Sequence, residues 1–195
     1  MQNEIKKETM KKYILAFIFA LTAGIIAAKP DVAVVKGSLV ELKSSNAKVY
    51  VRWDYSHSTI EDKPVNTYLK EHGDDWVRDY EAEIKRAEDN FRERLDDKSK
   101  DVSTVTNEKD ADYTIVMKVK NFNYGQTALA VAVGFGAGDA HLYGTMEIYK
   151  KGQSKPIAVL DVDGVPGAGY GNEIRRENAY RELAENLAKL IKKAK

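Results

Sequence analysis

The chain has 195 residues, 43% hydrophobic and 31% charged, with a formal net charge of +1. This apolar content suffices for the core of one domain, and the balanced charge argues against a nucleic-acid binder, which usually carries a basic stripe. The absence of cysteine excludes disulfides, thiolate metal sites and lipid attachment through a cysteine.

The N-terminus has the pattern of a secretory signal peptide. Residues 10–12 (MKK) form a short basic region, residues 13–26 are apolar apart from one Thr and one Gly, and Ala27 and Ala28 follow. We expect cleavage after Ala27 or Ala28. An uncleaved membrane anchor is the alternative, although the run is shorter than the roughly 20 residues that a spanning helix needs.

Cleavage there divides the chain into two parts. Residues 1–28 are the upstream residues plus the signal peptide, and residues 29–195 form a single domain. Residues 1–9 precede a second Met and are polar, as an unused upstream start would be. An exported chain without cysteine indicates the periplasm or cell surface of a bacterium, because small extracellular eukaryotic domains usually depend on disulfides.

The first half of the domain predicts two strands and a long helix. Residues 38–42 are a weak strand candidate, and residues 48–55 alternate between apolar and polar side chains as a half-buried strand does. After a polar connection over residues 56–64, a helix is expected from about Asp75 to Leu95, with an apolar stripe along one side. Asp74 or Asp75 is the candidate N-cap.

The second half predicts four strands followed by a closing helix. The strands are expected at residues 102–106, 113–122, 141–150 and 157–164, and the helix at about residues 173–193. The order is β-β-α-β-β-β-β-α. Strands grouped between two helices predict an α+β fold with a largely antiparallel sheet and two long helices packed on one face.

Residues 127–138 (TALAVAVGFGAG) are the most distinctive segment of the domain. They are almost free of polar side chains, although connections normally run over the surface. Three interpretations remain open: a buried strap, a self-association surface, or a contact with a bilayer. In the second and third, the contact residues are Leu129, Val131, Val133 and Phe135.

A glycine-rich turn precedes the closing helix. Gly167, Gly169 and Gly171 lie where backbone N–H groups and the helix dipole can hold an anion. The spacing G-x-G-x-G matches neither a dinucleotide fingerprint nor a phosphate loop, and no strand follows to complete a βαβ unit. A flexible linker that folds the helix back onto the sheet is the simpler interpretation.

No catalytic or metal-binding set is evident. His57, His72 and His141 show no metal-site spacing with one another, and His57 near Asp54 and Glu61 is the only local grouping worth naming, which a polar loop explains equally well. The stretch DVDG at residues 161–164 lacks the later ligands of a calcium loop. No catalytic residue, cofactor or metal is therefore predicted.

The segment VGFGAG at residues 133–138, with the following hairpin and helix, resembles a family of uncharacterised secreted bacterial proteins, often lipoproteins. The resemblance also includes Ala111-Asp112-Tyr113 at the start of a strand, and it covers about residues 111–193. It implies an exported protein, but the family has no established activity to transfer. The missing leader cysteine departs from the lipoprotein pattern. A looser likeness is to α+β envelope assembly domains of the curli-secretion and penicillin-binding-protein-activator type.

These features lead to one main functional hypothesis and one alternative. The main hypothesis is an exported envelope protein that acts as a non-enzymatic binding or assembly module through residues 128–138. Its expected partners are a second copy, another envelope protein or, peripherally, a membrane, and no nucleic acid is expected. The alternative is a small-ligand binder or weak hydrolase that uses the turn at residues 167–171.

Overall fold

The computed structural model describes residues 30–43, 46–125 and 138–195. The elements in chain order are β1 (Val32–Gly37), β2 (Ala47–Asp54), β3 (Thr59–Ile60), β4 (Lys63–Pro64), α2 (Val65–His72), α3 (Asp74–Lys98), β5 (Val102–Val105), the short 3-10 helix η1 (Glu108–Asp110), β6 (Tyr113–Asn123), β7 (Ala140–Lys150), β8 (Ala158–Gly167) and α5 (Asn172–Lys193). The predicted leader, residues 1–28, lies outside this part of the chain.

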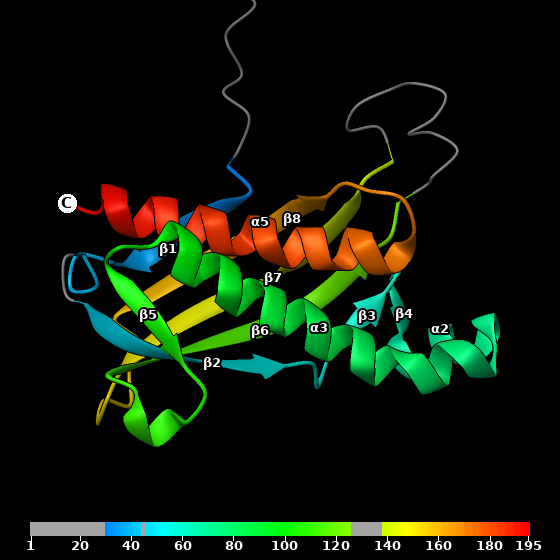
Figure 1. Ribbon diagram of the computed structural model, residues 1–195, viewed down its shortest axis with the longest axis horizontal. Coiled ribbons are helices and arrows are strands. Elements are labelled where there is room, and N and C mark those ends of the chain that lie inside the picture. Colours follow the sequence, from blue (N-terminus) through cyan, green and yellow to red (C-terminus); the bar gives the residue numbers. More distant parts are fainter. Residues whose placement is uncertain (1–29, 44–45, 126–137) are drawn as a thin grey trace, which may run out of the picture.

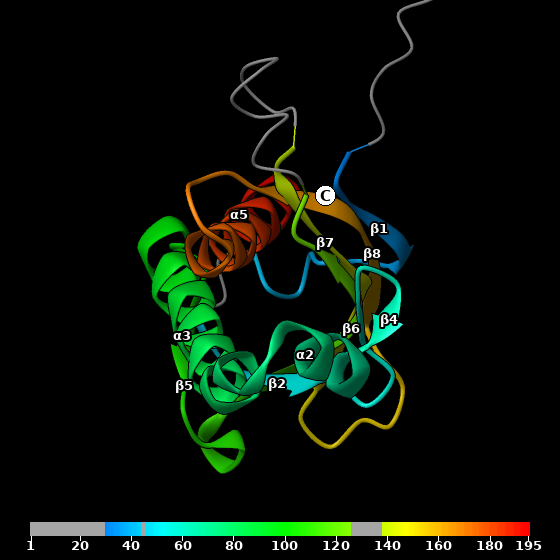
Figure 2. The same ribbon diagram turned by 90° about the vertical axis from the view of Figure 1, so that its right-hand side faces the viewer.

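The strands form one mixed sheet in the order β1-β8-β7-β6-β2-β5, and β3 and β4 extend it beside β6. The pairs β1–β8, β8–β7 and β7–β6 are antiparallel, whereas β2 pairs in parallel with both β6 and β5. The two long helices, α3 and α5, lie side by side against one face of the sheet (Figures 1 and 2). The α+β prediction, with a largely antiparallel sheet and both helices on one face, is therefore confirmed.

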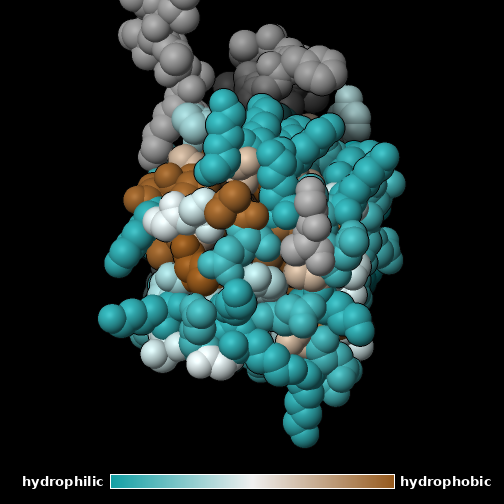
Figure 3. Space-filling model, turned by 90° about the vertical axis from the view of Figure 1, so that its left-hand side faces the viewer, coloured by the Kyte–Doolittle hydropathy of each residue, from teal (hydrophilic) through white to brown (hydrophobic). Residues whose placement is uncertain are grey.

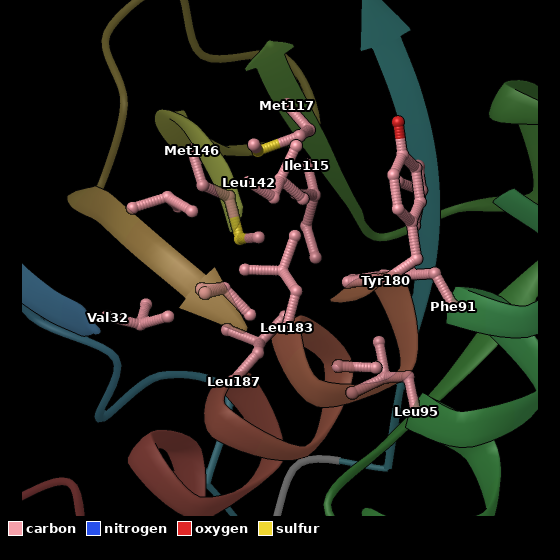
Figure 4. Packing of buried hydrophobic residues seen from close by; sticks show 14 of the residues in the cluster. Val32, Phe91, Leu95, Ile115, Met117, Leu142, Met146, Tyr180, Leu183 and Leu187 are labelled. Atoms are coloured by element: carbon pink, nitrogen blue, oxygen red, sulfur yellow. The ribbon is translucent and has the colours of Figure 1, made fainter. Parts of the chain in front are cut away.

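The core lies between the sheet and these two helices. From α5, the buried side chains of Tyr180, Leu183 and Leu187 point at the sheet, where they meet residues such as Met146 and Ile115 (Figure 4). The helix α3 adds buried Ala87, Phe91 and Leu95. Buried and partly buried residues alternate along most of β7, whereas in β6 the alternation is interrupted by three consecutive buried residues, Ile115, Val116 and Met117.

The first strand was predicted in the wrong place. The strand β1 occupies Val32–Gly37, and residues 38–43 form turns in which Leu42 N–H donates to Leu39 O and Lys43 N–H donates to Val40 O. Strand β1 lies at the sheet edge, and its burial pattern has no alternation after its second residue. The sequence signal for a strand is therefore reduced to three β-branched valines.

The start of α3 also differs from the prediction. Its N-cap is Gly73, with a φ of 108°, and no side chain caps the helix by a hydrogen bond. Asp74 and Asp75 lie inside the first turn, where their charges complement the positive end of the helix dipole. Before this helix, the polar connection predicted over residues 56–64 contains β3 and β4, and α2 was not predicted from the sequence.

Candidate functional site

The two segments singled out in the sequence attach to the same end of the sheet. Strand β6 ends at Asn123 opposite His141 of β7, and Ala140 pairs with Gly167 of β8. We call this place the loop end; it comprises Tyr124, Gly125, Gly138, Asp139 and residues 167–171. The candidate contact residues Leu129, Val131, Val133 and Phe135 lie outside the described residues.

One buried arginine connects the glycine-rich turn to the end of β6. Arg175, near the start of α5, is only 1% exposed. Its Nε donates to the carbonyl of Gly169 and its Nη1 donates to the carbonyl of Tyr124, both at 2.9 Å. Charge-assisted hydrogen bonds of this kind are about twice as strong as neutral ones. The guanidinium therefore holds both backbones in a fixed relation to α5.

The backbone that leads into the apolar segment is held closely as well. Gly125 has a φ of +69°, and a Cβ there would lie 2.2 Å from Asp139 O. Only glycine permits this approach. The N–H of Tyr124 donates to Glu61 Oε1 and that of Gly125 donates to Asn123 Oδ1, both at 2.7 Å. Burial and, to a lesser extent, the charge of Asp62 raise the pKa of Glu61.

A second buried arginine lies in an aromatic cage. The guanidinium carbon of Arg176 is 5.0 Å from the ring centre of Tyr80, 5.1 Å from that of Tyr124 and 5.6 Å from that of Phe122. These are cation–π distances. Nη1 donates to Glu83 Oε2 at 2.6 Å, and Nη2 is buried with no hydrogen-bond partner among the described residues. The cage thus joins α3, β6 and α5.

Neither arginine was predicted from the sequence to have a role. A signal for them exists, since positive side chains near the N-terminus of a helix oppose its dipole and need another reason to be there. The reason here is tertiary: both side chains turn inward from α5, where Arg175 donates to backbone carbonyls and Arg176 pairs with Glu83 of α3. Sequence spacing cannot identify such partners.

The three histidines have separate environments. His72 stacks on Tyr68, with the two ring centres 4.0 Å apart, and also contacts Trp76. It therefore belongs to the aromatic packing between α2 and α3. His57 is exposed, and His141 lies on β7. The neighbouring carboxylate of Asp54 accepts hydrogen bonds from Ser56. Within the described ranges, no three acidic or histidine side chains gather as a metal site would require.

The glycines of the predicted turn serve different purposes. Gly167 lies inside β8, where a Cβ would be 2.0 Å from Arg175 O and 2.9 Å from Ala179 N. The strand therefore continues three residues further than predicted, and the missing side chain lets α5 pack onto it. Gly171 is the N-cap of α5, with a φ of 87°. Its carbonyl accepts from the N–H of Arg175.

Two large hydrophobic side chains are exposed at this end. Tyr170 is 81% exposed and Ile174 is 50% exposed, on either side of the start of α5. They contrast with the buried arginines next to them in sequence. Contiguous exposed apolar groups mark interaction surfaces, and these two side chains are the exposed large hydrophobic groups of this end within the described residues.

A second polar contact lies deeper, between β2 and the helices. Tyr55 Oη donates to Glu88 Oε1 at 3.0 Å and lies 3.1 Å from Tyr180 Oη. Desolvation raises the pKa of Glu88 and, together with the nearby Tyr180 and Glu88, raises the pKa of Tyr55. These hydrogen bonds link the end of β2 to α3 and α5.

No protein-family model and no curated protein matches this chain. Among solved structures, the chain is similar to a PelC dodecamer from Paraburkholderia phytofirmans, with a TM-score of 0.42 and 12% identity over 79% of this chain and 96% of that one. A variant of the same PelC dodecamer gives a TM-score of 0.39 and 11% identity over 83% and 95% of the two chains. No residue role is carried over at these values. Among the described helices, none is long and apolar enough to cross a membrane.

Proposed function

We propose that this protein is a non-enzymatic binding and assembly module, exported to a bacterial envelope by its N-terminal leader. The loop end is its contact surface, together with the apolar residues 128–138 that join it. The first partner to consider is a second copy of the chain, because small apolar residues let two backbones approach closely.

The double hydrogen bond of Arg175 carries this proposal. It fixes the backbone at Gly169 and at Tyr124 to one helix. Burying an arginine is unfavourable unless its donors are satisfied. A fixed backbone with exposed Tyr170 and Ile174 beside it loses little conformational entropy when a partner binds.

The alternative function, a small-ligand or anion site at residues 167–171, has weaker support. Gly167 serves the packing of α5 on β8, and the carbonyl of Gly169 already accepts from Arg175. These contacts use the turn for structure.

Light scattering on a sizing column tests the assembly function. Every described element lies within residues 30–195, so the chain from Lys29 onward contains the whole fold. We expect a defined oligomer, and we expect Tyr170→Asp combined with Ile174→Asp to produce a monomer with an unchanged melting temperature. Val131→Asp should have the same effect.

The matched control is Val35→Asp, which adds a charge at a 61% exposed position on β1, far from the loop end in the sheet. It should leave the oligomer intact. A wild-type monomer contradicts self-association. If Val131→Asp unfolds the chain, residues 128–138 are part of the core and the proposed surface is wrong.

A further inference from the structure

A second exposed apolar surface lies away from the loop end, beside the C-terminus. It consists of Val34 and Val35 on β1 and Val40 in the turn that follows, and we call it the valine patch. Figure 3 shows it as a hydrophobic area surrounded by hydrophilic side chains. Edge strand β1 has no partner on its outer side within the described ranges.

The end of α5 lies next to this patch. Lys43 follows Val40 in the turn, and its Nζ donates to the carbonyl of Ala194 at 2.9 Å. The last residues of the chain therefore lie beside the turn, and Figure 1 places the C-terminus close to β1. This contact brings residues from both ends of the domain into one surface.

Lysines border the valine patch, and each is exposed: Lys36, Lys43, Lys192, Lys193 and Lys195. None of them pairs with a carboxylate within the described part of the chain. The turn contains one acid, Glu41. Its charge is neutralised by Lys150, whose Nζ lies 2.7 Å from Glu41 Oε2. The five lysines outnumber the other acids nearest to β1, which are Asp31 just before it and Asp161 and Asp163 on β8, so the local charge is positive on a chain whose net charge is only +1.

We propose that the valine patch and its lysines bind the surface of an anionic phospholipid membrane. Lysines attract acidic headgroups, and each lysine near the membrane surface adds to the binding free energy. Apolar side chains at the centre enter the boundary between headgroups and acyl chains. The helix dipole explains lysines at the end of α5, but it explains neither Lys36 nor the exposed valines.

The N-terminal leader provides a second argument. Its apolar run ends at Ile26, eight residues before Val34. A fully extended chain covers at most about 3.5 Å per residue, so the patch lies within about 28 Å of any bilayer that holds the leader. The surface therefore stays near a membrane if the leader is retained in it.

A second copy of the chain fits this surface poorly. In a two-fold dimer the patch would meet itself, and the lysines of both copies would face each other. The pairing of β1 with β8 also shifts register between Val34 and Lys36, and a bulge with an edge lysine hinders the addition of a strand.

Vesicle flotation tests the proposal, with the chain from Lys29 onward so that the leader does not bind by itself. We expect binding to vesicles of phosphatidylcholine with phosphatidylglycerol, little binding to phosphatidylcholine alone, and weaker binding at high salt. The triple variant Lys36→Gln, Lys192→Gln, Lys193→Gln should bind at least about tenfold more weakly.

The matched control removes the same number of charges elsewhere, as Lys70→Gln, Lys85→Gln, Lys100→Gln, all exposed on or beside α2 and α3. It should bind within about twofold of the wild type. The double variant Val35→Ser, Val40→Ser should also weaken binding without lowering the melting temperature, because both side chains are exposed.

The proposal is overturned if the wild type does not bind the anionic vesicles. It is equally overturned if the control substitutions weaken binding as much as the triple variant does. It is also overturned if the protein ignores vesicles and Val35→Ser, Val40→Ser converts a dimer to a monomer. In that case the occupant of the patch is a second copy.

Discussion

Arg176 is a buried charge that the fold satisfies only in part. It pairs with Glu83 and contacts three aromatic rings, while Nη2 lacks a partner among the described residues. Removing one member of such a pair leaves the other charge poorly solvated. Replacing Arg176 should therefore destabilise the fold more than replacing an exposed arginine would.

We expect Arg176→Ala to lower the free energy of unfolding by about 3 kcal/mol, because Glu83 loses its partner and the cage collapses around a void. Urea denaturation of the chain from Lys29 measures the loss. Arg181→Ala is the control: Arg181 is exposed and bonds to Asn90, so its loss should change stability by at most about 0.5 kcal/mol. Equal effects would contradict the cage as a source of stability.

Gly167 and Gly171 are four residues apart and should respond differently to substitution by alanine. A methyl at Gly167 meets the backbone of α5, so Gly167→Ala must push the helix away from β8. A methyl at Gly171 meets nothing within 4 Å, and only its φ of +87° opposes the change. We expect Gly171→Ala to cost about 1 kcal/mol and Gly167→Ala clearly more. Thermal unfolding ranks the two, and the reverse order would show that α5 does not pack here as described.

At the scale of elements, the sequence predicted best the strands and helices that have one face in the core, because their side chains follow a regular period. Strand β6 lies in the middle of the sheet and has its apolar side against the helices, so alternation was visible. Strand β1 borders solvent, and β3 and β4 have two residues each, too few for any period. Helix α2 has eight residues and only two buried side chains, which leaves no stripe to detect.

The same limit applies to the candidate site. The sequence indicated both glycine-rich segments because glycine spacing is local. Their convergence at one end depends on the antiparallel pairing of β6, β7 and β8, and the inward direction of Arg175 depends on carbonyls more than five residues away. Neither is a property of a short stretch of sequence.

A carboxylate of α3 binds strand β5. Asp96 accepts from the N–H and the hydroxyl of Thr104, at 2.6 and 2.7 Å. We expect Asp96→Ala to speed hydrogen exchange of the amides at residues 102–105 while β6 and β7 keep their protection, because β5 is an edge strand that pairs only with β2. The neighbouring Asp97→Ala is the control, since Asp97 contacts Arg94 and Lys98 and not β5. Unchanged exchange in β5 would show that strand pairing alone holds it.

At the scale of the whole molecule, stability should depend on pH through Glu88. Desolvation raises its pKa above the ordinary 4.5, so the folded state favours the protonated carboxyl. The stabilisation is complete below the unfolded pKa and is lost as the pH rises through the folded value. Glu88→Gln stays neutral and still accepts from Tyr55 Oη. It should therefore melt at a higher temperature than the wild type at pH 7, and at the same temperature below about pH 4.

Melting curves across this range provide the measurement. Glu93→Gln, at an exposed position of the same helix, corrects for the general effect of removing an acid. A difference between Glu88→Gln and the wild type that does not change with pH would contradict the desolvation of this carboxyl.

The position of β1 beside β8 affects how the chain folds. The partners of β1 come more than 120 positions later in the sequence, whereas β6, β7 and β8 are joined by consecutive antiparallel pairings. Because closing a long loop is slow, we expect β6 to β8 to form first and β1 to dock near the end. The N-terminal strand is synthesised first and gains its partner only when nearly the whole chain is available.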